Sequence, residues 1–178
     1  MLAGGASSRF GAPKGLAMLS GRTLVARVIS SLRAVGLPVV LIANDPAVAD
    51  QWDPSMPDRE PGCGPLSGIT TALGYAAGEG MNGALCVACD MPLVSPATLR
   101  SLAEGRLPSA VAYPGGKPGV PACFPAAMLP KLAGLGGEEG AALLLRGRRD
   151  VRLVECDPEE LRDVDWPEDL PEIARLLN

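Results

Sequence analysis

The chain opens with MLAGGASSRFGAPKG (residues 1–15), and the interpretation of the whole fold starts from this stretch. Two apolar residues run directly into a loop rich in glycine, serine and basic side chains. Such a loop normally follows a strand, and strands usually have about five residues. We therefore interpret Met1 and Leu2 as the end of a first strand, and we expect that strand to lack residues on its upstream side.

The composition of this loop suits a polyphosphate ligand. Gly4 and Gly5 have no side chains, so backbone N–H groups can approach an anion closely. Pro13 restricts the backbone just before Lys14, which lowers the entropy lost in aiming that cation. The spacing matches neither the P-loop nor G-x-G-x-x-G, and for the loop alone a surface turn stays the alternative. Its hydroxyl and basic side chains are Ser7, Ser8, Arg9 and Lys14.

Length and composition narrow the class of protein. With 178 residues and 47% hydrophobic content, residues 1–178 are expected to form one domain with a sizeable core. The balance of 16 basic against 20 acidic residues, with no basic run, argues against a nucleic-acid partner. No apolar stretch approaches the ~18 residues of a membrane helix, and no secretory signal is visible, so we expect a cytoplasmic protein.

The cysteines are predicted to be reduced, because five of them, scattered along the chain, make a poor disulfide framework. Cys86 and Cys89 form a C-x-x-C inside GALCVACD (residues 83–90), which has the pattern of a buried strand. Side chains three apart on a strand point to opposite faces, so we predict that this pair fills the core and holds no metal. The chain has no histidine, the commonest metal ligand and general base.

Apolar periodicity predicts alternating strands and helices. This alternation indicates an α/β fold of three layers, α/β/α, built on a mostly parallel, doubly wound sheet. In such sheets ligands bind at the carboxyl ends of the strands. The expected helices cover residues 23–36, 66–77, 96–103, 126–134, 138–147 and 167–178, and the expected strands 37–44, 83–90, 109–114, 120–125 and 150–156.

Acidic side chains at two strand or segment ends suggest a metal site. Asp90 ends the strand 83–90, where its carboxylate can meet Mg²⁺ bound to a phosphate. Asp163 and Asp165 can bring a second carboxylate to the same ion. Each of these has an alternative role in a turn or helix cap, the role that we expect for Glu168 and Asp169.

Four ordered motifs together resemble the nucleotidyltransferases related to molybdenum cofactor guanylyltransferase, the MobA-like NTP transferases. Residues 2–14 are similar to L-A-G-G-x-S-x-R-x-G-x-x-K, and GPLSGI (64–69) to G-P-L-x-G. CDMPLVSP (89–96) resembles C-D-x-P-x-x-x-P, and DVDWPEDL (163–170) resembles D-[IV]-[ND]-T-P-E-D-L. The resemblance spans nearly the whole chain and implies the fold of the nucleotide-diphospho-sugar transferases.

The resemblance implies a role for each matching residue. Arg9 and Lys14 would contact the triphosphate and act with Asp90 in catalysis, while Asp90 would hold Mg²⁺ with Asp165 as a second ligand. The nucleotide would be held by Leu2, Ala3, Gly4, Gly5, Ser7, Lys14, Asn44, Asp58, Gly64, Pro65, Gly68 and Asp90.

The implied reaction is an in-line attack of a terminal phosphate of molybdopterin on the α-phosphorus of GTP, with release of pyrophosphate. Because the attacking group is already an anion, the reaction needs no histidine and depends on positioning and charge neutralisation. The expected partners are therefore GTP or CTP and molybdopterin, with neither nucleic acid nor membrane, in a monomer or weak homo-oligomer.

Departures from the family pattern keep alternatives open. Trp166 stands where the pattern has threonine, and Asp165 where guanylyl enzymes more often have asparagine. GGKPGVPACF (115–124) resembles a segment of the related cytidylyltransferases with Val120 in place of histidine. LAGG and GPLSG favour GTP. A cytidylyltransferase, another small NTP transferase and a non-catalytic nucleotide-binding module remain alternatives, whereas a dinucleotide-dependent oxidoreductase lacks its glycine fingerprint here.

Overall fold

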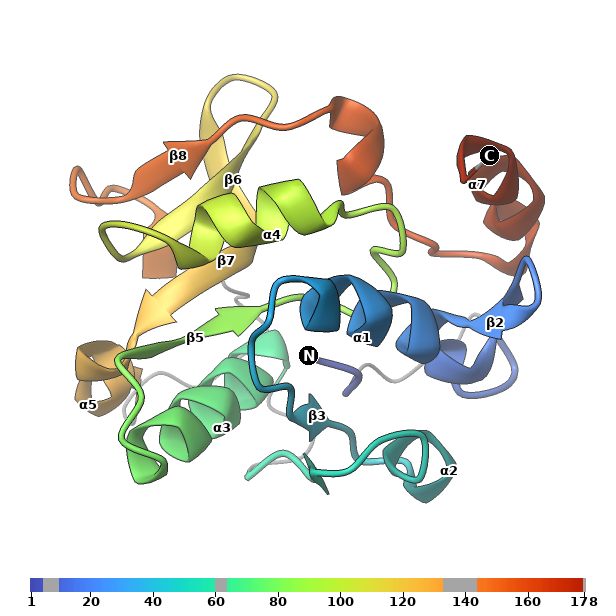
Figure 1. Cartoon of the computed structure of the whole chain (residues 1–178), viewed down its shortest axis with the longest axis horizontal. Helices are drawn as coiled ribbons and strands as arrows, with labels where there is room; N and C mark the ends of the chain where they lie inside the picture. The colour runs from blue at the N-terminus through green and yellow to red at the C-terminus, as the bar shows by residue number, and fades with distance from the viewer. Residues whose placement is uncertain (5–9, 60–63, 133–143, 178) are drawn as a thin grey trace.

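The computed structural model describes residues 1–4, 10–59, 64–132 and 144–177, and Figure 1 shows their arrangement. Leu2 lies at the centre of the sheet, with parallel bridges to Ile42 on one side and to Ala88 on the other. The N–H of Leu2 donates to the Val87 carbonyl at 2.8 Å, and the N–H of Cys89 donates to the Leu2 carbonyl at 2.9 Å. The opening residues therefore form the predicted first strand.

Leu2 joins two sets of strands into one sheet. On one side lies β3 (Leu41–Ile42), which pairs in parallel with β4 (Ser55–Met56). On the other side Leu2 pairs with Ala88, in the segment that follows β5 (Gly83–Cys86). Three further strands lie beyond β5 in the sheet. These follow in the order β5-β7-β6-β8, with β6 at Ser109–Tyr113, β7 at Lys117–Pro125 and β8 at Arg152–Val154.

The predicted mostly parallel sheet is confirmed, with β7 as the reversed strand. It runs antiparallel to both β5 and β6, whereas β6 and β8 are parallel. The hairpin that joins β6 to β7 turns at Gly115 and Gly116, whose φ angles of +80° and +71° favour glycine. It follows that β5, β6 and β8 all point their carboxyl ends to the same edge of the sheet.

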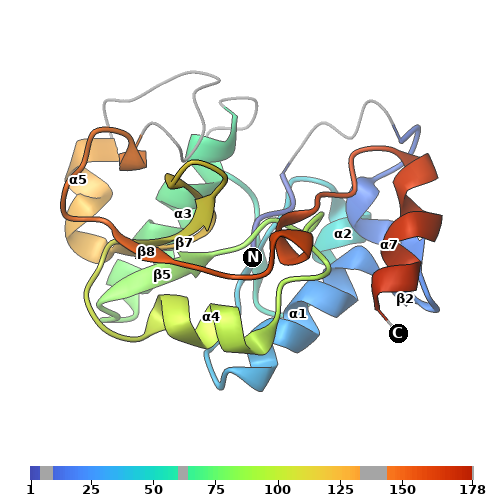
Figure 2. The same cartoon turned by 90° about the horizontal axis from the view of Figure 1, so that it is seen from above.

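Helices cover both faces of the sheet, as the sequence predicts (Figure 2). On one face lie α1 (Leu24–Ala34) and α4 (Pro96–Ala103), and on the other α3 (Pro65–Gly78) and α5 (Leu129–Leu132). Neighbouring strand residues divide between the two faces: Leu41 packs in one apolar cluster with helix α1, and Ile42 packs in another with helix α3. This alternation gives the three layers.

The C-terminal helix α7 (Leu170–Leu176) packs on a small hairpin that the sequence did not predict. Its Ile173 is buried with Leu19 and Leu24. The hairpin turns at Ser20 and Gly21, which have φ angles of +45° and +77°. Its strands are too short for a periodic pattern, so composition could not reveal them. The remaining elements are η1 (Lys14–Leu16), β1 (Met18–Leu19), β2 (Arg22–Thr23), α2 (Pro46–Ala49), η2 (Ala126–Met128), η3 (Pro158–Leu161) and η4 (Pro167–Asp169).

Expected element bounds agree best for the helices. The helix predicted at 96–103 is exact, and the one predicted at 23–36 runs from Leu24 to Ala34. The strand predicted at 37–44 forms a regular ladder over Leu41–Ile42 alone. The segment predicted as a helix at 138–147 lies largely outside the described residues. Among the described residues, no helix is both long and apolar enough to cross a bilayer.

The C-x-x-C cysteines lie on opposite faces of the sheet, as the strand periodicity predicts. Cys86 packs with Phe124 in the cluster under helix α3, and Cys89 packs with Val28 in the cluster under helix α1. Burial raises the pKa of each thiol to about 12, so both stay protonated. Their role is to fill the core.

Two glycines near strand β5 give a matched test of the packing. A Cβ added at Gly83 would collide with the Phe124 carbonyl oxygen on the paired strand β7, whereas one added at Gly78 meets no atom within 4 Å. We expect Gly83→Ala to lower the free energy of unfolding by about 2 kcal/mol. Gly78→Ala should raise it by about 0.5 kcal/mol, because alanine restricts the unfolded chain. Urea unfolding measures both, and equal stabilities would contradict this account of the strand pairing.

Candidate functional site

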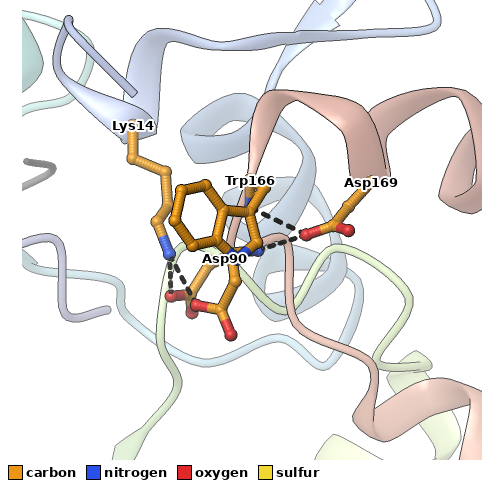
Figure 3. Close-up of polar contacts among 5 residues, drawn as sticks. Lys14, Asp90, Trp166 and Asp169 are labelled. Atoms are coloured by element: carbon orange, nitrogen blue, oxygen red, sulfur yellow. Dashed lines mark hydrogen bonds and ion pairs between the residues drawn. The ribbon is translucent and has the colours of Figure 1, made fainter. Parts of the chain in front are cut away.

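The first cluster at the carboxyl edge of the sheet joins one lysine to two carboxylates. The ammonium nitrogen of Lys14 lies 2.9 Å from Oδ2 of Asp90 and 3.4 Å from Oδ1 of Asp165. Figure 3 shows Lys14 and Asp90 pointing toward one another. Lys14 opens η1, Asp90 follows the strand that pairs with Leu2, and Asp165 precedes η4. Segments far apart in the sequence thus meet at one point.

Backbone contacts fix the carboxylates of this cluster. The N–H of Val164 donates to the Asp90 carbonyl at 2.8 Å, which ties the segment 163–165 to the end of the central strand. Oδ2 of Asp169 accepts hydrogen bonds from the N–H groups of Asp165 at 2.8 Å and Trp166 at 2.7 Å. Figure 3 shows these two bonds. Asp169 therefore acts in the predicted N-terminal cap, and it also positions the backbone of Asp165. In the sequence, only the capping-box spacing of Asp169 could have indicated this second role.

The charges of this cluster reinforce one another. Desolvation acts to lower the pKa of Lys14, but the hydrogen bond and charge of Asp90, with those of Asp165, outweigh it and raise that pKa. Asp163 is an exposed residue, but its carboxyl group is partly desolvated. This desolvation, together with the charges of Asp90 and Asp165, raises the pKa of Asp163 to about 7. Within the described residues, the ion pairs here join two carboxylates to one ammonium group, so the cluster attracts further positive charge.

The same carboxylates fit a divalent metal ion. Asp90 and Asp165 already converge on one cation, the ammonium group of Lys14. Among the described residues, no group of three or more metal-ligating side chains occurs. Mg²⁺ is typically bound by one or two carboxylates, with substrate phosphates and water completing its coordination. The donor set therefore fits a metal ion that arrives together with a phosphate ligand.

A second cluster surrounds Asp58, near the ends of strands β3 and β4. The amide Nδ2 of Asn44 donates to Oδ2 of Asp58 at 3.0 Å, and the N–H of Asp58 donates to Oδ1 of Asn44 at 2.8 Å. A Cβ on Gly4 would lie 2.6 Å from Oδ2 of Asp58, and one on Gly68 would lie 3.3 Å from its Oδ1. Gly4 is therefore required for this close approach, and Gly68 leaves the carboxylate room that a larger residue would narrow.

The carboxylate of Asp58 is buried and incompletely satisfied. Only 8% of the residue is exposed, and among the described residues its Oδ1 has no hydrogen-bond partner. Desolvation raises the pKa of Asp58, and the hydrogen bond from Asn44 only partly opposes that shift. A buried acceptor without a donor destabilises a fold unless something else satisfies it. The most direct explanation is a ligand that brings a donor to Oδ1.

The other residues that the sequence predicts to hold the nucleotide lie in the first strand, at the start of helix α3, or outside the described residues. Leu2 and Ala3 lie in the central strand, with the Ala3 N–H bonded to the Ile42 carbonyl at 2.8 Å. Gly64 caps helix α3 with a φ of +71°, and Pro65 begins that helix. Gly5, Ser7 and Arg9 lie outside the described residues. The structure thus brings together two clusters at the sheet edge, on either side of the first strand: Lys14, Asp90 and Asp165 in one, and Gly4, Asn44, Asp58 and Gly68 in the other.

A doubly wound sheet with a buried acceptor carboxylate and a cation-binding carboxylate pair at its carboxyl edge defines a nucleotide-dependent enzyme of the α/β class. The MobA-like NTP transferase domain model matches residues 1–154. The chain belongs to this family and is a nucleotidyltransferase.

Several relatives align with nearly the whole chain. A molybdenum cofactor guanylyltransferase of Rhodobacter capsulatus is 30% identical over 96% of this chain and 90% of its own length. A probable molybdenum cofactor guanylyltransferase of Deinococcus radiodurans is 31% identical, over 97% and 91%. A phosphoenolpyruvate guanylyltransferase of Rubrobacter xylanophilus is 35% identical, over 97% and 87%. These relatives share the guanylyl transfer and differ in the acceptor.

Among solved structures, Rv0371c of Mycobacterium tuberculosis in complex with manganese has a TM-score of 0.74 and 25% identity. The match covers 98% of this chain and 95% of that chain. A divalent metal ion is therefore bound by a protein with this fold, in agreement with the carboxylate pair described above.

Proposed function

We propose that this chain transfers GMP from GTP to a terminal phosphate of molybdopterin or the molybdenum cofactor, with Mg²⁺ and with release of pyrophosphate. Residues 1–178 would form one cytoplasmic catalytic domain. The observation that carries the proposal is the buried Oδ1 of Asp58, to which no described residue donates a hydrogen bond. It lies at the same sheet edge where Asp90 and Asp165 hold the ammonium group of Lys14.

The base preference follows from the chemistry of Asp58. A carboxylate only accepts hydrogen bonds. Guanine presents a ring N–H beside an amino group, so it offers two adjacent donors, whereas cytosine offers its amino group next to an acceptor nitrogen. Asn44 adds an amide at the same place, close to the exposed Gly4. This combination favours guanine, and the guanylyl relatives support the same choice.

The catalytic roles follow from the other cluster. Asp90 and Asp165 would hold Mg²⁺, whose charge neutralises the phosphates during the reaction. Lys14 would exchange its two carboxylate partners for the triphosphate, and Arg9 would supply a second positive charge to it. The attacking phosphate oxygen forms a bond to the α-phosphorus while the bond to the β-phosphate oxygen breaks. Both the nucleophile and the leaving group are anions, so no side chain needs to carry a proton.

A nucleotide panel tests this proposal. Purified protein with Mg²⁺ and molybdopterin should release pyrophosphate from GTP at least about tenfold faster than from CTP, ATP or UTP, because the wrong base leaves Asp58 unsatisfied. Enzyme-coupled detection of pyrophosphate measures these rates. A preference for CTP would overturn the guanylyl assignment, and no release with any nucleotide would favour a non-catalytic binding module.

The relative from Rubrobacter xylanophilus gives a second candidate acceptor, phosphoenolpyruvate. Phosphoenolpyruvate, like molybdopterin, carries a phosphate that can attack GTP. Replacing molybdopterin by phosphoenolpyruvate in the same assay separates the two. We favour molybdopterin because two relatives named as molybdenum cofactor guanylyltransferases, one of them as probable, align over 96% and 97% of this chain.

A further inference from the structure

A hollow of about 230 Å³ lies between helix α1 and the segment that follows helix α2. Its walls combine basic, neutral polar and apolar side chains. Among the described residues that line it, none is acidic and none belongs to the two clusters at the carboxyl edge of the sheet. The lining residues used below are Arg22, Ile29, Ser30, Arg33, Gln51 and Trp52.

One end of this hollow lies away from the predicted nucleotide residues. The indole N–H of Trp52 donates to the Val39 carbonyl at 2.9 Å. Val39 precedes strand β3, whereas Asn44 of the nucleoside cluster follows that strand. Arg33, in the last turn of helix α1, lies over the Trp52 ring. Trp52 and Arg33 therefore mark the amino end of β3, opposite to the end where the nucleoside cluster lies.

The hollow carries positive charge that no described carboxylate neutralises. Arg22 and Arg33 take part in none of the ion pairs that the described residues form. Desolvation and the charge of Arg22 lower the pKa of Arg27, so the charge of Arg22 acts on its basic neighbour. The whole chain has 16 basic and 20 acidic residues, so a local excess of arginine does not follow from composition. Such an excess attracts an anion.

Both guanidinium groups are positioned before any ligand binds. The guanidinium carbon of Arg33 lies 5.6 Å from the centroid of the Trp52 ring, and the Trp52 ring is itself held by its hydrogen bond to the backbone. Arg22 donates through Nη2 to the Ala26 carbonyl at 3.4 Å, which uses one of the five N–H groups of an arginine. A positioned cation loses less conformational freedom on binding, and guanidinium groups bind phosphate oxygens through paired hydrogen bonds.

The other walls suit an apolar ring attached to the anion. Ile29 is buried, and with the Trp52 ring it supplies an apolar surface. Ser30 and Gln51 add a hydroxyl and an amide that can donate to oxygen atoms. A phosphate monoester is nearly a dianion at pH 7, which matches two guanidinium groups. We propose that this hollow binds a small phosphate monoester with a compact ring, at a site separate from the catalytic edge of the sheet. The inference goes beyond the proposed function and does not depend on it.

Phenyl phosphate is the probe for this site, because it carries a phosphate monoester on a single ring. The chain has two tryptophans, so in a Trp166→Phe background Trp52 is the one fluorescent indole. We expect phenyl phosphate to change this fluorescence, and Arg22→Gln and Arg33→Gln each to weaken its binding at least about tenfold. The matched control is Arg106→Gln, which removes the same charge from an exposed position that does not line the hollow.

Three comparisons test the ligand class and the location. Benzoate, a monoanion on the same ring, should bind at least about fivefold more weakly than phenyl phosphate, and phenol at least about tenfold more weakly. Lys14→Gln removes the cation of the catalytic edge and should leave the affinity for phenyl phosphate unchanged within about twofold. Because Arg22 and Arg33 are exposed, their variants should keep Tm within about 2 °C of wild type. Calorimetry measures the same affinities without the indole.

Each contrary result overturns a stated part of the inference. No binding of phenyl phosphate to the wild type at millimolar concentration, or equal binding in both arginine variants, removes the site. Loss of binding in Lys14→Gln places the probe at the catalytic edge instead. Benzoate that binds as tightly as phenyl phosphate rules out the choice of a phosphate monoester. None of these measurements involves release of pyrophosphate, so the proposed function stands or fails separately.

Discussion

Asp90→Asn is expected to lower kcat for pyrophosphate release about 10³-fold. The variant keeps the size of the side chain but removes the charge that Lys14 contacts at 2.9 Å and that a metal ion needs. Charge stabilisation by a metal ion typically supplies several kcal/mol to such a transition state, which corresponds to a loss of this order. Stopped assays of pyrophosphate with saturating GTP and molybdopterin measure the rate.

Two comparison variants make this prediction specific. Asp165→Asn should cost only about tenfold, because the family pattern has asparagine at this position and because the Asp165 oxygen is more exposed and lies farther from Lys14, at 3.4 Å. Asp50→Asn, at an exposed position after helix α2, should leave the rate unchanged. Binding of GTP measured by calorimetry should survive in Asp90→Asn. If that variant turns over within about tenfold of wild type, Asp90 does not hold the metal.

The fold was predictable from the sequence wherever a pattern repeats over several residues. Helix α1 follows from apolar residues at helical spacing, and Thr23 caps it through its hydroxyl, which accepts from the Ala26 N–H at 3.1 Å. The first strand was predicted from only two apolar residues, Met1 and Leu2, because the glycine-rich loop must follow a strand. Strand β3 is shorter than predicted, and just before it the Val39 carbonyl accepts a hydrogen bond from the indole N–H of Trp52 at 2.9 Å, a side-chain contact that the sequence pattern does not show.

The candidate site, like the fold, was predictable from the sequence only in part. Motif spacing identified Lys14 and Asp90, but no local pattern could reveal that Lys14 bonds to Asp90 and Asp165 at once, since the contact to Asp165 spans 151 positions. The pairing of Asn44 with Asp58 likewise depends on the parallel alignment of β3 and β4.

Asp58→Asn is expected to weaken GTP binding about 30-fold while it raises the stability of the free protein. The new amide can still accept from Asn44 through its oxygen, which places its NH₂ group at the position of Oδ1, to which no described residue donates. The nucleotide then meets a donor where it needs an acceptor, and hydrogen bonds to charged groups contribute about 1.5–3 kcal/mol. Calorimetric titration with GTP measures the loss.

The gain in stability follows from the raised pKa of Asp58. Because burial raises this pKa in the folded state, the ionised carboxylate destabilises the fold at neutral pH. The destabilisation is complete above the folded pKa, decreases as the pH falls through it, and disappears below the unfolded value of 3.8. Thermal unfolding at pH 7 should therefore show a higher Tm for Asp58→Asn, by roughly 2–4 °C for each kcal/mol gained.

Opposite changes in binding and stability distinguish a ligand-binding carboxylate from a structural one. A purely structural Asp58 would lose stability on substitution and would affect GTP binding only through misfolding. A carboxylate kept for its ligand shows the reverse, because the free protein bears the cost of the unsatisfied Oδ1 and the bound nucleotide removes it. If Asp58→Asn binds GTP as tightly as wild type, the nucleoside does not contact this residue, and the guanine preference must arise elsewhere along the sheet edge.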